Sequence, residues 1–411
     1  MTHISNYHTK SPRLLIILNR FVIGGQAVDT IPLAWFLKND FDILILYGEK
    51  EKDEIEPSFL IEKYPGLVLK KIKYLRRSIN PFSDLFAFFT VLFTILKYKP
   101  HIVHTHGAKS GFIGRITSFL SGVPVVVHTF HGHFFHSYFS RNISALIAFV
   151  ERSVGKITTS AICLSPAQKQ ELVETYKILP ASKVSIIPLG FAFDQQQSAG
   201  QCRQAFRNKY GLQPHDVAVG IVGRIVPVKN HAFFLQVAEQ ILAEATNTNV
   251  AFFVVGDGEV RDKVEALLTE KQIAFNNNRI TAANRVVFTS WITDMYEVMN
   301  GLDIVALTSL NEGTPLSVIE AQYFKKPVVS TDAGGVRDTM IDNVTGFITN
   351  QDDLPAFKQK LQLLINNREL RETMGEAGCK FASEQFSKQN EIDRTKSFYF
   401  SLLAHKGLHF Q

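Results

Sequence analysis

The chain has 411 residues, 45% of them hydrophobic and 20% charged, and its formal net charge is +6 at pH 7. This length favours two or more domains, and the composition is ordinary for globular proteins. The three cysteines are far apart and form no CxxC pair, which argues against a disulfide framework and against structural zinc. The positive charge indicates an anionic partner, for which phosphates, nucleic acid and anionic lipid are all candidates.

The sequence contains no apolar stretch long enough to predict a membrane-spanning helix. The start, MTHISNYHTKSPR, is polar and lacks the apolar core of a signal peptide. The longest apolar run is LFAFFTVLFTIL at 85–96, which has 12 residues, whereas a membrane span needs about 20. We therefore expect this run to form a buried helix. We expect a cytoplasmic protein, either free or at the inner face of the cell membrane.

The first half of the chain alternates strand-like and helix-length segments. Apolar strands are predicted at 13–19, 41–47, 101–106 and 124–130. The segments between them are long enough for helices, at about 25–38, 82–98 and 109–121. Continuous apolar strands separated by helices indicate a parallel sheet covered on both faces.

The same pattern begins again after a polar, glutamine-rich linker. Further strands are predicted at 216–223, 250–256, 285–290, 303–309 and 327–331. We therefore predict an N-terminal domain at 1–190, a linker at 191–202, a C-terminal domain at 203–385 and a final helical segment in 386–411. Two such doubly wound domains would face each other across a cleft, with ligands at the carboxyl ends of the strands.

Two cations follow the first strand of the C-terminal domain, in the stretch GRIVPVKN. Gly223 permits a tight turn after the strand, and Arg224 and Lys229 flank the short loop before the next helix. Arg can bind phosphate oxygens with two parallel hydrogen bonds, while Lys acts as a point charge. This pair suits a diphosphate, although two exposed cations in a loop are also common without any ligand.

Two glutamates bracket the stretch NEGTPLSVIEA, at 311–321. The preceding segment 303–309 is a predicted strand, Thr314 is a plausible N-cap, and Pro315 suits the first turn of a helix. Free amides and the positive end of the helix dipole would then face an anion. Glu320 lies about 7.5 Å further along the helix axis than Pro315. Each carboxylate, Glu312 and Glu320, suits a vicinal diol, such as that of a sugar ring or a ribose.

Four stretches of the C-terminal half together resemble one enzyme family. GRIVPVKN, VVGDGE, NEGTPLSVIEA and STDAGGVRDTMIDNVTGF, in this order, are similar to the retaining nucleotide-sugar glycosyltransferases of family 4, whose fold is GT-B. Glu312 and Glu320 match that family's E-x7-E motif. The resemblance extends to GGQAVDTIP at 24–32 and to HIVHTHGAKSGFIGRI and PVVVHTFHGH, so it covers nearly the whole chain. It implies two doubly wound Rossmann-like domains, with the last helix crossing back onto the first.

The resemblance also implies roles for residues of the C-terminal half. Arg224 and Lys229 would bind the donor diphosphate and stabilise the leaving group. Glu312 would hold hydroxyls of the transferred sugar, and Glu320 the ribose diol. The backbone amides of Leu316 and Ser317 would face the phosphates. Residues 289–291 would border the base.

In the N-terminal half, the resemblance implies a loop and a histidine that act on the donor. Gly24 and Gly25 would form a loop that closes on donor and acceptor, and His131 would reach the donor sugar near the reacting carbon. The usual proposal for the family is front-face attack, with neither glutamate as nucleophile and the departing diphosphate accepting the acceptor's proton. No metal or other cofactor is expected. The family often has Glu about two residues after GGV, where this chain has Arg337 and Asp338, so these two receive no role.

The function that follows is transfer of a sugar from a nucleotide-diphospho-sugar to a glycan or polyprenyl-linked acceptor, in cell-surface polysaccharide or lipopolysaccharide synthesis. The main alternative is a GT-B-type nucleotide-sugar epimerase. A glycoside hydrolase with two catalytic carboxylates would leave the phosphate-binding cations without a purpose. A non-catalytic nucleic-acid or lipid-binding protein would leave the order of the strand-end motifs unexplained, and we expect no nucleic-acid partner.

Several other histidines gather at strand ends of the N-terminal half. His104 and His106 alternate onto one strand face and could suggest a metal pair, but no third ligand is evident, so we favour local hydrogen bonding. His128 lies within a strand and is interpreted as structural. His133 and His136 receive no role.

Two further patterns have simple interpretations. Asp40-Phe-Asp42 fits the DxD motif of metal-dependent glycosyltransferases, but it opens a strand far from the phosphate-binding segments, and we treat it as coincidence. A basic run in 69–82 is either a solvated face or a contact with an anionic membrane, where each cation would add up to about 1 kcal/mol. Its cations are Lys70, Lys71, Lys73, Arg76 and Arg77.

Overall fold

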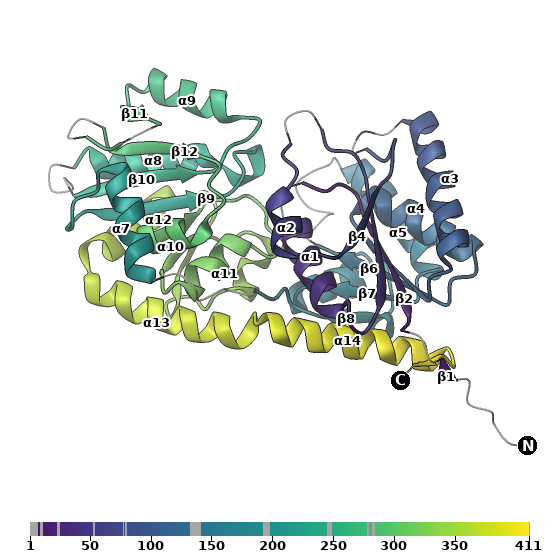
Figure 1. Ribbon diagram of the computed structural model, residues 1–411. Helices are drawn as coiled ribbons and strands as arrows, with labels where there is room; N and C mark the ends of the chain where they lie inside the picture. Colours follow the sequence, from purple (N-terminus) through teal and green to yellow (C-terminus); the bar gives the residue numbers. More distant parts are fainter. Residues whose placement is uncertain are drawn as a thin grey trace, which may run out of the picture. The chain divides into compact units, whose positions relative to one another are not determined.

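The computed structural model of the 411-residue chain describes two compact units (Figure 1). One comprises Met1–Ala192 with Phe386–Gln411, and the other comprises Phe193–Gln385. The residues described are 7–8, 11–22, 25–51, 54–76, 78, 80–131, 141–191, 198–244, 249–277, 279–281 and 284–410.

The N-terminal unit is built on a seven-stranded parallel sheet, with strand order β4-β3-β2-β5-β6-β7-β8. The order reverses between β2 and β5, so their carboxyl ends form a topological switch point, where ligands bind in such sheets. The strands are β2 (Arg13–Leu18), β3 (Asp42–Tyr47), β4 (Val68–Lys71), β5 (Ile102–His106), β6 (Val125–Phe130), β7 (Ser160–Cys163) and β8 (Val184–Ile186). A short pair joins the chain ends, β1 (Tyr7–His8) to β16 (His409–Phe410).

Helices cover both faces of this sheet, as the sequence predicts. The helices α1 (Gly25–Leu37), α2 (Ser58–Lys63) and α14 (Lys388–His405) pack on one face, around Leu14, Ile16 and Ile45. On the other face lie α3 (Pro81–Tyr98) and α4 (Ala108–Leu120), around Leu15, Ile17 and Val103. The remaining helices are α5 (Arg141–Lys156), α6 (Pro166–Gln170), the π-helical turn η1 (Glu171–Thr175) and the 3-10 turn η2 (Ala181–Lys183).

The apolar run at 85–96 does lie in a helix, α3, but the expectation that this helix is buried is wrong. Its inner side packs on the sheet through Ala87, Val91 and Ile95. Its outer side leaves large apolar side chains exposed, among them Phe82 at 80% and Phe93 at 64%. By length and composition alone, α3 is the one helix in the described part of the chain that could cross a membrane.

The C-terminal unit is a second parallel α/β sheet, with strand order β11-β12-β10-β9-β13-β14-β15. Two parallel-sheet units with helices on both faces are the predicted architecture. The strands are β9 (Val217–Val222), β10 (Val250–Val255), β11 (Phe275–Asn276), β12 (Val286–Ser290), β13 (Ile304–Leu307), β14 (Val328–Thr331) and β15 (Gly346–Thr349). The helices are α7 (Ala199–Tyr210), α8 (His231–Leu242), α9 (Arg261–Glu270), α10 (Met295–Gly301), α11 (Leu316–Tyr323), α12 (Leu354–Asn366) and α13 (Arg368–Gln385), with 3-10 turns η3 (Pro227–Lys229) and η4 (Gly334–Asp338).

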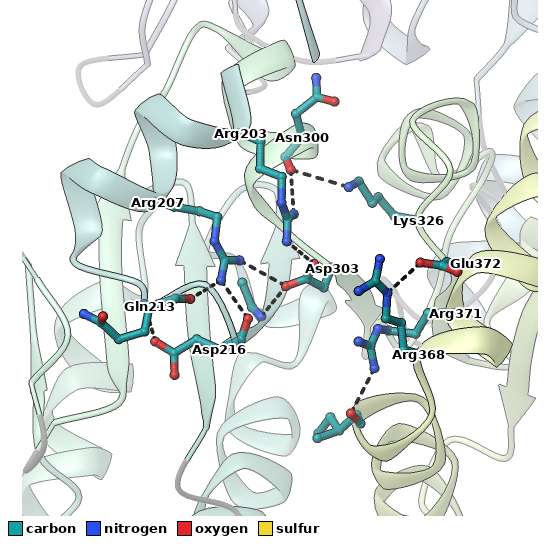
Figure 2. Close-up of polar contacts among 12 residues, drawn as sticks. Arg203, Arg207, Gln213, Asp216, Asn300, Asp303, Lys326, Arg368, Arg371 and Glu372 are labelled. Atoms are coloured by element: carbon teal, nitrogen blue, oxygen red, sulfur yellow. Dashed lines mark hydrogen bonds and ion pairs between the residues drawn. The ribbon is translucent and has the colours of Figure 1, made fainter. Parts of the chain in front are cut away.

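An ion-pair network fastens α7 to the amino-terminal edge of this second sheet (Figure 2). Asp303, just before β13, accepts hydrogen bonds from Arg203 at 2.7 Å and from Arg207 at 3.3 Å. Arg207 also donates to the backbone carbonyl of Asp216, whose carboxylate pairs with Arg285 at 2.6 Å. These cations are paired with carboxylates at the amino-terminal edge of the sheet, whereas ligands bind at the opposite edge. We therefore interpret the network as structural.

The helix α14 is anchored to α1 by a buried charge cluster. The Lys388 ammonium lies 3.1 Å from the Asp29 carboxylate and 2.5 Å from that of Glu391. Glu391 also accepts the backbone N–H of Gly190 at 3.0 Å. All three charged side chains are more than nine-tenths buried, so each depends on its partners for the charge compensation that water would otherwise give.

This cluster predicts the effect of removing its cation. Lys388→Met should lower the free energy of unfolding by about 3–5 kcal/mol, because two buried carboxylates lose their counter-charge. The exposed Lys396→Met, in the same helix, should change it by about 1 kcal/mol or less, since Lys396 pairs with Asp40 only at the surface. Denaturant unfolding of both variants measures this, and equal losses would contradict it.

Candidate active site

The loops that follow β9 and β13 converge at the carboxyl edge of the second sheet. These strands are neighbours in the sheet, and their continuations are hydrogen-bonded to each other. The Leu310 N–H donates to the Val228 carbonyl at 2.8 Å, and the Thr308 hydroxyl donates to the Lys229 carbonyl at 3.0 Å. These bonds fix the 3-10 turn η3 against the segment that carries Glu312.

The result is a close ion pair between two residues that are 83 positions apart. The Lys229 Nζ lies 2.5 Å from Glu312 Oε1, and both side chains are largely buried, with 20% and 11% exposure. The same carboxylate oxygen accepts the Ser309 hydroxyl at 2.5 Å. Ser309 is not among the site residues predicted from the sequence. Its position at the end of a predicted strand, three residues before Glu312, was the available signal.

The backbone of Glu312 is held as firmly as its side chain. Its carbonyl accepts the N–H of Gly335 at 2.9 Å. Gly334 has φ +53°, and a Cβ there would lie 2.1 Å from the Glu312 carbonyl oxygen, so only glycine allows this approach. The segment DAGGVRD therefore supports the glutamate loop, and its Arg337 pairs with Asp332 at 2.7 Å.

The helix α11 begins one residue later than predicted. Pro315 is its N-cap and Leu316 its first residue, whereas the sequence predicted Pro315 in the first turn and Thr314 at the cap. Within the described chain, the first-turn amides of Leu316 and Ser317 donate to no other residue. The end of this helix therefore presents free N–H groups beside the Glu312 loop, as an anion site requires.

The second glutamate of the motif, Glu320, lies in the middle of α11 and is half-buried. Its burial raises the pKa of the carboxyl from 4.5 to about 7. A carboxylate in this position is poorly solvated and would gain from hydroxyl donors such as those of a diol.

The remaining residues of this unit that are predicted to bind the sugar donor lie at the same carboxyl edge of the sheet. Arg224 follows Gly223 directly after β9 and is exposed. Residues 289–291 end β12, and the Ser290 carbonyl accepts the N–H of Gly256 at 3.1 Å, next to the end of β10. The structure thus brings Arg224, Lys229, Glu312, Leu316, Ser317 and Glu320 to loops and a helix at one sheet edge.

In the N-terminal unit, His131 follows β6 directly and is half-buried. Its Nε2 lies 2.7 Å from Nδ1 of His106, and burial lowers its pKa. Gly25 is the first residue of α1, whereas Gly24 lies outside the described residues, as do His133 and His136.

His104 and His128 form hydrogen bonds with nearby hydroxyl groups, although one partner of His104 lies 295 positions away in the chain. The ring of His104 lies between the Tyr399 hydroxyl, 2.6 Å from Nδ1, and the Thr129 hydroxyl, 2.7 Å from Nε2. His128 Nδ1 lies 2.9 Å from the Thr105 hydroxyl. Burial lowers the pKa of His104 to about 3 and that of His128 well below its usual value, so both rings are neutral at physiological pH.

The Asp40–Asp42 motif and the basic run in 69–82 both contain residues that form ion pairs. Asp40 pairs with Lys396 at 2.5 Å, and Asp42 is an exposed residue at the amino end of β3, away from the strands' carboxyl edge. In the basic run, Lys71 pairs with Glu56 and Arg76 with Glu49, while Lys70 and Lys73 are exposed. Arg77 lies outside the described residues.

The raised pKa of Glu320 predicts a pH-dependent stability. Between roughly pH 4.5 and 7 the folded protein keeps a proton on this carboxyl that the unfolded chain loses, so the group lowers stability as pH rises. Glu320→Gln should therefore raise the melting temperature more at pH 8 than at pH 5. Thermal unfolding at both pH values measures this, with the exposed Glu270→Gln as control. A difference that does not grow with pH would contradict it.

Comparison with known proteins agrees with this geometry. The model of the glycosyl transferases group 1 matches residues 203–381, and that of glycosyltransferase family 4 matches residues 23–195. The chain is 27% identical to the UDP-Gal:alpha-D-GlcNAc-diphosphoundecaprenol alpha-1,3-galactosyltransferase of Escherichia coli, over 80% of this chain and 83% of that protein. It is also 27% identical to the capsular polysaccharide biosynthesis glycosyltransferase CapM of Staphylococcus aureus, over 80% and 84%.

Solved structures share the fold. Anabaena HepE, solved in complex with UDP and glucose, superposes with a TM-score of 0.76 at 20% identity, covering 95% of this chain and all of that one. Sucrose-phosphate synthase of Thermosynechococcus elongatus superposes with a TM-score of 0.79 at 18% identity, covering 96% and 100%. The two matched families, the two doubly wound sheets and the converging loops agree, and the chain belongs to the family 4 glycosyltransferases of the GT-B fold.

Proposed function

We propose that this glycosyltransferase transfers a sugar, with retention of anomeric configuration, from a nucleotide-diphospho-sugar to a lipid-linked or polymeric glycan. The observation that carries the proposal is the Lys229–Glu312 ion pair at the carboxyl edge of the second sheet, beside the free amides of α11. The cation and the amides of the helix end suit phosphates, and the carboxylate beside them suits sugar hydroxyls.

The charges of this site suit a donor with a diphosphate. Lys229 and the amides of Leu316 and Ser317 would compensate the phosphate charge, and exposed Arg224 is free to reach over it. These groups supply the positive charge that a metal ion supplies elsewhere, so we propose that no metal is required. Glu320, further along α11, would accept the two ribose hydroxyls.

The surroundings of Glu312 favour a positioning role over a nucleophilic one. Its Oε1 is occupied by both Lys229 and Ser309, which lowers its availability to attack a sugar carbon. In the proposed reaction, an acceptor hydroxyl oxygen bonds to the anomeric carbon on the face from which the diphosphate departs. The bond from that carbon to the diphosphate oxygen breaks, and the acceptor's proton passes to the same oxygen. Catalysis then depends on positioning and on charge stabilisation of the leaving group.

The names of two relatives support the proposed acceptor. The Escherichia coli relative acts on a diphosphoundecaprenol-linked sugar, and the Staphylococcus aureus relative acts in capsular polysaccharide biosynthesis. We therefore propose that this chain extends a glycan in cell-surface polysaccharide synthesis. A nucleotide-sugar epimerase, the alternative with the same fold, would consume donor and release an isomerised sugar without any acceptor.

Substitution of the ion pair tests the proposal. Lys229→Ala and Glu312→Gln should each lower kcat/KM for transfer by about 10²–10³-fold, because each removes a group that holds the donor's reacting end. The exposed pair Lys325–Glu376 in the same unit, 2.8 Å apart, supplies matched controls, Lys325→Ala and Glu376→Gln, which should retain activity. Circular dichroism checks that all four variants are folded.

Proton NMR of the product reads out the mechanism directly. The anomeric coupling constant should show the same configuration as the donor, and EDTA should not change the rate. An inverted product would contradict retention, loss of activity in EDTA would contradict the metal-free reaction, and turnover without acceptor would favour the epimerase.

A further inference from the structure

The outer face of α3, α4 and α5 is unusually apolar for a protein surface. These helices pack side by side along one face of the N-terminal sheet, and Figure 1 shows α3 next to α4. Their exposed large apolar side chains are Phe82, Leu85, Phe86, Phe89, Phe93 and Leu96 of α3, Phe112, Phe119 and Leu120 of α4, and Ile143, Leu146 and Phe149 of α5. A gathering of exposed apolar side chains on three adjacent helices is typical of an interaction site.

The charges on this apolar face have one sign. Among the exposed positions that the structure describes on the three helices, none is acidic, and the charged ones are Lys97, Arg152 and Lys156. The acids of these helices are not exposed: Asp84 is half-buried and pairs with Lys109 at 2.6 Å, and Glu151 is buried and pairs with Arg115 at 2.8 Å. Exposed Lys70 and Lys73 lie just before α3 in the chain. An apolar face whose exposed charges on α3, α4 and α5 are all cations, among the residues described, is complementary to an anionic lipid surface.

We propose that the α3–α4–α5 face inserts into the surface of an anionic membrane. The helix α3 lies on the membrane and does not cross it, because Ala87, Val91 and Ile95 are committed to the sheet beneath. A second copy of the chain is a poorer occupant, since symmetric pairing would bring like charges together. The apolar side chains contribute most of the binding, because two cations of the preceding basic run are already paired with Glu49 and Glu56.

The position of this face suits a lipid-linked acceptor. In a parallel sheet all strands end at one edge, and α4 begins two residues after β5 ends at His106. The amino-terminal ends of α3 and α4 therefore lie at the carboxyl edge of the N-terminal sheet. Docking by this face brings that edge to the bilayer, where a polyprenyl-linked glycan presents its sugar.

Vesicle flotation tests the docking face. The full chain should float with vesicles of phosphatidylethanolamine and phosphatidylglycerol, more weakly with phosphatidylcholine, and 0.5 M NaCl should reduce binding without abolishing it. Phe86→Glu with Phe93→Glu should lower the partition coefficient by at least about a hundredfold, because two exposed rings that would enter the lipid are replaced by charges. The matched control is Ile61→Glu with Leu363→Glu, at exposed positions of α2 and α12, which should float like the native chain.

Two outcomes would overturn the proposal. The first is that the Phe86/Phe93 variant floats at the native level, or that neither the variant nor the native chain floats. The other is a lipid-free dimer in sedimentation that this variant converts to monomer, which would assign the face to a second copy. Transfer to a water-soluble acceptor analogue, measured in parallel, should be unchanged in the variant, so a failure here is separate from failure of the proposed reaction.

A second inference comes from the hydrogen bond between His106 and His131. The two ring nitrogens, His106 Nδ1 and His131 Nε2, are 2.7 Å apart, so one must carry the proton and the other must accept it. The other nitrogen of His106, Nε2, is buried and has no hydrogen-bond partner among the residues that the structure describes. The pKa of each ring is lowered by burial, so both are neutral imidazoles at physiological pH.

The orphaned nitrogen decides which ring donates. If His131 donated, neutral His106 would carry its own proton on Nε2, as a buried N–H without an acceptor, which costs about 1–3 kcal/mol. If His106 donates from Nδ1, its Nε2 carries a lone pair and no proton. A buried lone pair without a partner costs less free energy than a buried N–H without an acceptor. His106 is therefore the donor. His131 accepts on Nε2 and must carry its proton on Nδ1.

We infer that His106 is a positioning residue that fixes the tautomer of His131. With Nε2 occupied, His131 can offer a substrate only the N–H of Nδ1, so it donates a hydrogen bond and takes up no proton. This inference rests on the proposed function, together with the role near the donor sugar that the family resemblance implies for His131. The tautomer itself is a property of the free protein.

Nitrogen-15 NMR of histidine-labelled protein tests the tautomer without reference to activity. The His131 signals, identified by their loss in His131→Asn, should show a protonated Nδ1 and an unprotonated Nε2. His106→Phe should move the proton of His131 toward Nε2, and His106→Asn, whose amide can occupy the place of Nδ1–H, should restore the native pattern. A protonated Nε2 in the native protein, or no change in His106→Phe, would overturn the inference.

Kinetics separate a positioning role from a structural one. His106→Phe should lower kcat for transfer by about tenfold or more with little change in melting temperature, and His106→Asn should recover most of the loss. Equal kcat losses in His106→Phe and His106→Asn would contradict positioning. If the tautomer behaves as expected but His131→Asn transfers sugar at the native rate, the proposed role of His131 fails while the tautomer assignment stands.

Discussion

The C-terminal unit depends on one constraint, which is that two neighbouring strands must end with their loops bonded to each other. The bonds from Leu310 to Val228 and from Thr308 to Lys229 bring a cation and a carboxylate together at the carboxyl edge. Without them, Lys229 and Glu312 would be two surface residues 83 positions apart. The supporting contacts of Ser309 and Gly335 hold the carboxylate where a ligand can compete for it.

This arrangement also resolves an electrostatic difficulty. Two carboxylates near a diphosphate would repel it, yet both are suited to hold the hydroxyls on either side. Lys229 pairs with Glu312, and the free amides of Leu316 and Ser317 lie between Glu312 and Glu320 along the chain, so in the proposed complex these groups would compensate the charge of the diphosphate. The raised pKa of Glu320 comes from the burial of its carboxyl, which disfavours the charged form.

Much of this organisation could be predicted from the sequence, because the signals are local. Each buried strand is a short apolar run, and the glycines and cations that follow it mark the edge where ligands bind. The E-x7-E spacing places Glu312 before α11 and Glu320 within it, as the structure has them. Even so, the helix begins at Leu316 and not at Pro315, because the backbone of Pro315 is extended, with φ −71° and ψ 101°, and this residue is the N-cap.

The contacts that could not be predicted join distant segments or depend on what covers a surface. The partners of Lys388 include Asp29, 359 residues away, and nothing in either local sequence indicates the other. The pair His106 and His131 meets only because β5 and β6 are neighbours. For α3, a helix that is apolar all round gives no sequence signal of which side is covered, and the expectation of burial followed from composition alone.

The central claim is that the C-terminal unit holds a nucleotide-diphospho-sugar by charge compensation. Thermal-shift titration of the full chain against a panel of nucleotide sugars, in EDTA, tests it most directly, because a ligand that binds the folded state raises the melting temperature with its concentration. We predict that at least one nucleotide-diphospho-sugar gives a saturable rise, that the corresponding nucleoside monophosphate gives a smaller one, and that Lys229→Ala removes the difference. A panel without any saturable rise, or a rise that is the same in Lys229→Ala, would contradict the account.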